Sequence, residues 1–176
     1  MKKILFVLLL TPVILFSQDN SLVSIWQPLE YFAGKWEGHE TGRAGIGKGD
    51  RSYQFIMGAR YLFMKNTSRF EPQEKNPKGE THEDWTIFSF DEERQKFILR
   101  QFNIEGFVNR FVLDSLVNLN KTFVFTSESS ENAPPGLRAR LSYYIQNQDE
   151  FRETFELAMP GKEFSIYLEN FWKRRK

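Results

Sequence analysis

The sequence predicts an all-β protein: a closed antiparallel meander barrel of about ten strands with a short N-terminal helix. Three observations favour this fold class. Eighteen Phe, six Tyr and four Trp are spread along the whole chain, and aromatic side chains favour strands because they pack well across a pleated surface. Turn-forming residues recur about every ten positions, as in a β-sandwich or barrel. Apolar and polar residues alternate in the C-terminal segments, as expected for strands with one apolar face.

The start of the chain has the pattern of an export signal. Two lysines follow the initial methionine, and an apolar run over residues 4–16 is broken by Pro12. A charged region before a short apolar core is typical of a cleaved signal peptide, whereas a membrane-spanning helix needs about 20 apolar residues. We therefore expect a signal peptide over residues 1–18 and a single β-barrel domain over residues 19–176. The expected location is the periplasm or the extracellular space.

Composition excludes several classes of function. The chain has no cysteine, so it has no disulfide, thiolate nucleophile or Cys-type zinc site. It carries 24 basic and 23 acidic residues, and loss of the two signal lysines leaves one more acid than base. A nearly neutral chain lacks the electrostatic footprint of a nucleic-acid-binding protein. We expect no nucleic-acid partner and no membrane span after signal cleavage, and oligomeric state is left open.

Helical spacing and strand alternation place the expected elements. Trp26, Leu29 and Phe32 recur at helical spacing and Gly34 follows them, which predicts a short helix over residues 25–33. Short turns between neighbouring strands predict a meander, and a long meander closes on itself to remove its edges. The predicted strands, bounded by Gly, Pro, Asn and Asp, cover 35–41, 48–57, 60–70, 81–90, 96–104, 107–117, 122–126, 137–145, 151–159 and 163–172.

Between the first two predicted strands, the glycine-rich run over residues 42–49 could suggest a phosphate-binding loop. It lacks the spacing of such a loop and opens a strand rather than a helix. We interpret it as a flexible hairpin bend.

Gly34-Lys35-Trp36 follows the predicted helix and opens the first strand. This Gly-x-Trp motif resembles the lipocalin superfamily, and the overall pattern is similar to lipocalins and fatty-acid-binding proteins. The resemblance implies that Trp36 closes one end of the barrel and that Arg174 stacks on it in a cation–π contact.

A longer set of motifs resembles a family of uncharacterised lipocalin-like bacterial proteins over about the first half of the mature chain. It comprises G-x-W-x-G at Gly34 to Gly38, the glycines between residues 42 and 49, and the segment Met57 to Leu62. The family has no established common reaction, so this resemblance implies fold rather than function. It also suggests Arg60 as a further interior cation.

The nitrobindins, a more distantly similar group, hold haem through a histidine near the C-terminus. No histidine follows His82 here, so the resemblance supplies no haem ligand and we expect no cofactor. On a strand, His82 and Asp84 would share one face while Glu83 points away. One histidine among such carboxylates is a weak metal site or triad, and we interpret it as a solvated strand end. No Gly-x-Ser-x-Gly elbow is present either, so we expect no metal site and no enzyme.

Polar side chains interrupt otherwise apolar strand faces at four positions: Arg100, Asn109, Glu153 and Asn170. Burying an unpaired polar group costs a few kcal/mol, so a barrel interior that is only a core would avoid them. A ligand site, in contrast, needs a few polar groups in an apolar cavity. Two other interpretations stay open: Arg100 pairs with Glu153, or a β-bulge shifts the alternation and leaves them in solvent.

We therefore expect a barrel that binds or carries a small apolar or amphipathic molecule. Its head group, polar or anionic, would meet Arg100 or Arg60, because ionic contacts strengthen in a low-dielectric cavity. The aromatic residues expected to line the cavity are Tyr53, Phe55, Trp85 and Tyr143. The alternative is a structural or interaction module whose barrel is filled by its own aromatic side chains.

Overall fold

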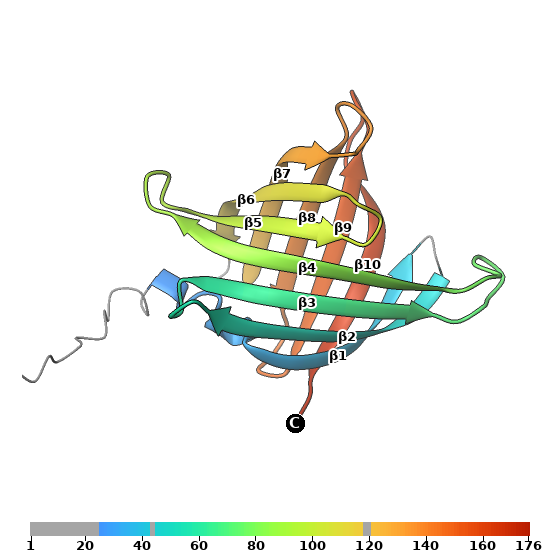
Figure 1. Cartoon of the computed structure of the whole chain (residues 1–176), viewed down its shortest axis with the longest axis horizontal. Helices are drawn as coiled ribbons and strands as arrows, with labels where there is room; N and C mark the ends of the chain where they lie inside the picture. Colours follow the sequence, from blue (N-terminus) through green and yellow to red (C-terminus); the bar gives the residue numbers. More distant parts are fainter. Residues whose placement is uncertain (1–24, 43–44, 118–120) are drawn as a thin grey trace, which may run out of the picture.

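The computed structural model describes residues 25–42, 45–117 and 121–176 (Figure 1). Within these ranges ten antiparallel strands form one closed barrel, which confirms the predicted fold class. The expected signal peptide and the predicted turn at residues 118–120 lie outside the described residues. The strands are β1 Gly34–Gly42, β2 Gly45–Ile56, β3 Tyr61–Phe70, β4 Glu80–Asp91, β5 Lys96–Asn103, β6 Val108–Val117, β7 Thr122–Glu131, β8 Arg138–Ile145, β9 Glu150–Ala158 and β10 Ser165–Arg174.

Each strand pairs with its neighbours in sequence, and β1 pairs with β10 to close the ring. In Figure 1, β2 to β5 run across the view and β8 to β10 cross behind them more steeply. Because successive strands alternate in direction, the connections divide between two ends. We call the end with the N-terminal segment and the β2–β3, β4–β5 and β8–β9 turns the plug end. The opposite end, with the β3–β4, β5–β6, β7–β8 and β9–β10 connections, is the distal end.

The predicted helix over residues 25–33 is wrong in its extent. In the structure residues 25–26 are helical, turns follow over residues 27–29, and the segment ends in the 3-10 helix η1, Glu30–Phe32. A spacing of three residues also brings side chains to one face in 3-10 turns. Trp26, Leu29 and Phe32 are therefore buried together, and the segment fills the plug end. No helix among the described residues is long and apolar enough to cross a membrane.

The structure brings together Trp36 and Arg174, the two residues predicted to form the barrel plug. The indole N–H of Trp36 donates to the carbonyl oxygen of Phe32 at 2.7 Å. The guanidinium of Arg174 lies 4.2 Å from the Trp36 ring centroid and donates to the carbonyl oxygens of Ala33 and Tyr31 at 2.8 and 2.7 Å. Since Trp36 and Arg174 are also directly opposite in the β1–β10 pairing, the plug and the barrel closure share residues.

The four glycines between residues 42 and 49 lie in strands rather than in a flexible bend. Residues 43 and 44, between the two strands, lie outside the described ranges. Gly42 ends β1, and the other three belong to β2. Phe70 covers the inner side of Gly47, where an added Cβ would come within 2.7 Å of its ring. Leu168 occupies the corresponding space at Gly42. These glycines are places of close packing inside the barrel.

The interior next to the plug end is filled by its own apolar side chains. The Phe32 ring lies 5.2–5.6 Å, centroid to centroid, from the rings of Tyr53, Phe123, Tyr143 and Phe151. Further members of this core are Leu62, Met64, Phe88, Phe97, Leu99, Phe111, Phe125 and Leu141. Such ring contacts are typical of a packed core.

Candidate functional site

The character of the inward side chains changes along the barrel axis. We call the part of the barrel from about the level of Arg51, Thr86 and Trp172 to the distal end the distal half. Most of the buried side chains that point inward there are polar. The buried polar side chains there are Glu40, Arg51, Asn66, Ser68, Asp84, Thr86, Asn109, Glu153 and Asn170. They come from seven strands, so the strand alternation itself brings them together.

An ion pair between Arg51 on β2 and Glu153 on β9 lies at the centre of this half. Nη1 of Arg51 donates to Oε2 of Glu153, and Nη2 lies 3.4 Å from Oε1. Nε of Arg51 donates to Oδ1 of Asn66 at 3.1 Å, and Nη1 also donates to the Tyr53 hydroxyl at 3.3 Å. The guanidinium carbon lies 4.0 Å from the Trp172 ring centroid. Arg51 is thus fully engaged by protein groups.

Burial and neighbouring charges act in opposition on this pair. Burial is the largest single effect and lowers the pKa of Arg51, but Glu153, Tyr53, Tyr143 and Asp84 together outweigh it and leave that pKa well above its usual value. Burial raises the pKa of Glu153; Arg51 lowers it, and the carboxylates of Glu40 and Asp84 raise it further. The pair is held together in an interior that contains more acid than base.

A chain of hydrogen bonds extends from the ion pair around the wall. Nδ2 of Asn66 donates to Oγ of Ser68 and to Oδ2 of Asp84, both at 3.0 Å. The Ser68 hydroxyl donates to Oε1 of Glu40. Nε2 of Gln101 lies 3.3 Å from Oδ1 of Asp84, so β1, β2, β3, β4 and β5 are linked by polar contacts. Networks of this kind orient their members.

The interior network reaches the distal rim through His82 on β4. Its Nε2 lies 3.6 Å from Oδ2 of Asp84, and its Nδ1 lies 2.8 Å from Oε1 of Glu105 in the β5–β6 connection. Burial lowers the pKa of His82, but the two carboxylates outweigh it and raise the pKa to about 9. His82 and Asp84 share a face as predicted; His82, however, is an ion-paired cation rather than a solvated strand end.

Three buried polar atoms in the distal half have no hydrogen-bond partner among the described residues. They are the hydroxyl oxygen of Thr86, Oδ1 of Asn170 and the indole nitrogen of Trp172. All three side chains are at most 2% exposed. An unsatisfied buried polar group costs about 1–3 kcal/mol. These atoms are therefore the groups that a bound polar molecule would satisfy.

Six of the residues predicted for the ligand site lie on the inner face of the barrel. Asn109, Glu153 and Asn170 belong to the polar distal half, and Tyr53 and Tyr143 are buried next to it. Tyr143 lies directly opposite Glu153 in the β8–β9 pairing, so these two are brought together. Phe55, which is half-buried, belongs instead to the plug side, where its ring lies 5.6 Å from that of Trp26.

The predicted interior positions of Arg60, Trp85 and Arg100 are wrong. Arg60 is exposed in the β2–β3 turn, and Trp85 is 49% exposed on the outer face. Arg100 also faces outward and donates to the hydroxyl of Ser89 at 3.0 Å. The register of β5 with both neighbours runs without a shift, so regular alternation rather than a bulge turns Arg100 outward. The interior partner of Glu153 is Arg51, not Arg100.

The missed interior residues have a recognisable reason in the sequence. Arg51 follows Gly47 and Gly49 on the inner face of β2, and Glu40 lies between Gly38 and Gly42 on β1. Glycine gives no apolar signal, so the interruption of an apolar face that marked Glu153 was absent at these positions. On β3, however, the sequence Leu62, Met64, Asn66, Ser68 and Phe70 at alternate positions does carry that signal.

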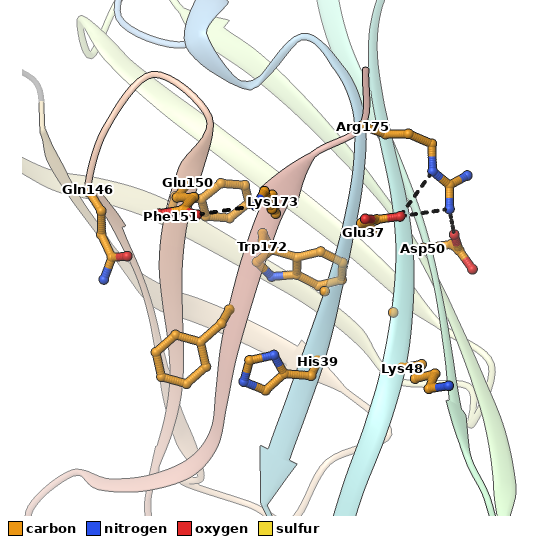
Figure 2. Close-up of a pocket in the computed structure, with 13 residues that line it drawn as sticks. Glu37, His39, Lys48, Asp50, Gln146, Glu150, Phe151, Trp172, Lys173 and Arg175 are labelled. Carbon is orange, nitrogen blue, oxygen red and sulfur yellow. Dashed lines mark hydrogen bonds and ion pairs between the residues drawn. The ribbon is translucent and has the colours of Figure 1, made fainter.

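A hollow of about 660 Å³ lies on the outer wall across β9, β10, β1 and β2. Figure 2 shows Arg175 reaching to Glu37 and Asp50, and Nη2 of Arg175 lies 2.7 Å from Oδ1 of Asp50. The His39 ring stacks on Phe171 at 4.9 Å. The charged side chains that line this hollow form ion pairs with one another at the surface. The buried polar distal half of the barrel is therefore the stronger candidate site. No cluster of three or more metal-ligating side chains occurs within the described ranges.

No protein-family model matches this chain, and a search of curated proteins finds no match either. Solved structures match by fold. Rv2717c from M. tuberculosis is 16% identical with a TM-score of 0.64, over 86% of this chain and 98% of that one. The S-type phycobiliprotein lyase CPES from Guillardia theta is 11% identical with a TM-score of 0.54, over 86% and 93%. EF1p2_mFAP2b, bound to DFHBI, is 9% identical over 86% and 99%, and its TM-score of 0.45 supports no inference.

The strand order and these similarities show the fold, a closed antiparallel β-barrel of the lipocalin-like kind. Identities of 16% and 11% show a shared fold alone. The narrower bacterial family suggested by the sequence motifs stays a prediction.

Proposed function

We propose that this barrel binds a small molecule in its distal half. The observation that carries the proposal is the set of three buried, inward atoms without partners at Thr86, Asn170 and Trp172. A barrel that only stabilised itself would gain by replacing such groups with apolar ones. A binding site gains from them, because they pair when the ligand arrives.

The half-buried apolar side chains at the distal end favour an amphipathic ligand. Phe155 and Leu157 on β9 pack against the core from this side, and Leu168 on β10 lies beside them in the register. The molecule would place its polar group among the network and its apolar part against these side chains. This differs from the expectation that arginines at positions 60 and 100 meet a head group, since both face outward.

The alternative is a structural or interaction module with a filled barrel. It is favoured by the dense ring packing around Phe32 in the plug half. That packing leaves the polar distal half unexplained, which is why binding is the leading proposal.

The proposal is for binding rather than catalysis. His82 adjoins the interior network, and its raised pKa of about 9 keeps it protonated at neutral pH. A protonated imidazole held by two carboxylates cannot accept a proton as a general base.

We also propose that the protein acts after export, on the pattern of the first eighteen residues. The mature N-terminus is then expected at Gln18 or Asp19. Sequencing the N-terminus of the protein from its own host tests this, and an intact Met1 would contradict it.

The test of the binding function is native mass spectrometry of the protein purified from its own host. The expected result is a stoichiometric small-molecule adduct that is lost in the Asn170→Leu variant, with the fold kept. The matched control is Glu169→Gln, the neighbouring position on β10, whose side chain pairs with Arg152 on the outer wall. A wild type without any adduct, together with an Asn170→Leu variant of higher stability, would favour the filled barrel instead.

A further inference from the structure

The distal half contains more acidic than basic side chains. Glu40, Asp84 and Glu153 are buried there, at 3%, 4% and 5% exposure, and Arg51 is the buried cation among the described residues. His82 adds a second positive charge at the rim. The interior therefore holds three carboxylates against two cations.

Two of the three carboxylates have cationic partners. Glu153 is paired with Arg51, and Asp84 is paired with His82 and accepts hydrogen bonds from Asn66 and Gln101. Glu40 differs from both: among the described residues it has no ion-pair partner, and its hydrogen-bond donor is the Ser68 hydroxyl. A buried carboxylate without a cation is costly unless something neutralises it.

The strand register places a second acceptor next to Glu40. Glu40 on β1 lies directly opposite Asn170 on β10, and Asn170 lies directly opposite Glu153 on β9. Three acceptor side chains thus form one row across the inner wall. Arg51 occupies one end of the row at Glu153. Within the described ranges, no donor reaches Oδ1 of Asn170 and no cation pairs with Glu40.

We propose that the bound molecule carries a cationic nitrogen group, a primary ammonium or a guanidinium, that is held by Glu40 and Asn170. This inference rests on the proposed binding function and deepens it. An ammonium supplies three N–H donors and no acceptor, which matches a carboxylate beside an unsatisfied amide oxygen. The indole N–H of Trp172, two residues along β10, is free for an acceptor elsewhere on the same molecule.

Two further features support a cation over an anion. The pKa of Glu153 is raised by burial and then by Glu40 and Asp84, against the effect of Arg51, so an added positive charge would relieve the excess of acid. An anion would have to displace Glu153 from Arg51, because Arg51 already directs its nitrogens to Glu153, Asn66 and Tyr53.

The test compares matched ligand series that differ in head group. Primary alkylamines from ethylamine to decylamine, and carboxylates of the same lengths, are added at pH 7 and fixed ionic strength, and the melting temperature is followed. A ligand that binds only the folded state raises the melting temperature. We expect members of the amine series to raise it and the carboxylates to leave it unchanged.

The variants Glu40→Gln and Glu37→Gln complete the design. The first keeps the shape of the side chain and removes its charge, and we expect it to weaken amine binding at least tenfold. The second removes an exposed charge from the outer face of the same strand and should bind amines as the wild type does. Near-ultraviolet circular dichroism and the denaturant midpoint establish that both variants are folded.

If Glu40→Gln is not folded, Asn170→Leu takes its place. Stabilisation by carboxylates in place of amines, or an unchanged amine effect in Glu40→Gln, overturns the assignment of a cation. So does a wild type that responds to neither series. The binding function itself is judged separately, by the adduct found in native mass spectrometry.

Discussion

The six-membered ring of Trp172 lies against the backbone of Gly49, in the space that a side chain at position 49 would occupy. A Cβ added to Gly49 would come within 2.9 Å of Cζ3 of Trp172, and one added to Gly38 would come within 2.8 Å of Cε3. Gly38 and Gly49, which lie opposite each other in the β1–β2 register, thus form the surface on which the Trp172 ring packs. Arg51 covers the same indole at 4.0 Å.

The first prediction tests the packing of Trp172 on Gly49. Gly49→Ala should lower the free energy of unfolding by about 1–3 kcal/mol, the usual cost of overpacking a core. The double variant Gly49→Ala/Trp172→Leu should lose less unfolding free energy than the sum of the two single losses, because the smaller side chain gives room for the new methyl group. Denaturant unfolding of the two single variants and the double variant measures the coupling. Additive losses would mean that Trp172 does not depend on Gly49.

The second prediction concerns the plug. Trp36 is 1% exposed, and Trp36→Ala should cost about 3–5 kcal/mol of stability, as for other large-to-small changes at buried aromatic residues. Trp85→Ala is the control, since that tryptophan is about half exposed on the outer face and should cost less than about 1 kcal/mol. Equal losses in the two variants would contradict the assignment of Trp36 as the closing side chain.

The third prediction distinguishes the contribution of the Arg51–Glu153 ion pair to stability from that of the other contacts of Arg51. Arg51→Leu or Glu153→Leu alone should cost about 3–5 kcal/mol, because each leaves the other charge buried and unpaired. The double variant should be more stable than either single variant, because no charge is then left alone. Arg100→Leu should change stability by less than about 1 kcal/mol, as is typical of outer positions. A double variant as unstable as the sum of the single ones would show that Arg51 acts mainly through Asn66 and Tyr53.

The fourth prediction is a pH dependence of stability through His82. The pKa of His82 rises from 6.5 to about 9 on folding, so its contribution is complete below pH 6.5 and is lost as the pH rises through 9. The wild type should therefore lose more unfolding free energy between pH 6 and pH 10 than His82→Gln does. Glu105→Gln, which removes one of the two carboxylates at His82, should give a smaller loss than the wild type. Identical profiles in all three proteins would rule out the ion-paired histidine.

Much of the fold could be predicted because strand alternation and turn residues are local signals. Nine of the ten strands agree closely with the predicted ranges, and the Gly-x-Trp motif correctly indicated the contact of Arg174 with Trp36. The N-terminal segment was predicted as one helix over residues 25–33, but turns separate its helical residues 25–26 from the 3-10 helix at Glu30–Phe32, because a three-residue spacing is shared by helices and tight turns. β7 continues to Glu131, beyond the predicted end at residue 126, through polar residues that carry little strand signal.

The site could be predicted only in part. Which side chains of a strand point inward depends on the alternation, and an error of one residue assigns every side chain to the opposite face. Ile98 is 1% exposed although it lies on the outer face, and this hidden outer residue made Arg100 look interior. Glu153, Asn109 and Asn170 were found because large apolar neighbours flank them on the same face. Glu40 and Arg51 were missed because glycines flank them, and no local signal reveals that a tryptophan from β10 covers those glycines.

The pairing of β1 with β10 has a consequence for the order of events in folding. It joins segments far apart in the chain: the hydrogen bond from Arg174 to Ala33 spans 141 residues. Loop-closure entropy makes such distant contacts slow to form, so the seam is expected among the later contacts. Glu40 and Asn170 face each other across that seam. The row formed by Glu40, Asn170 and Glu153 is therefore assembled only when the ring of strands closes.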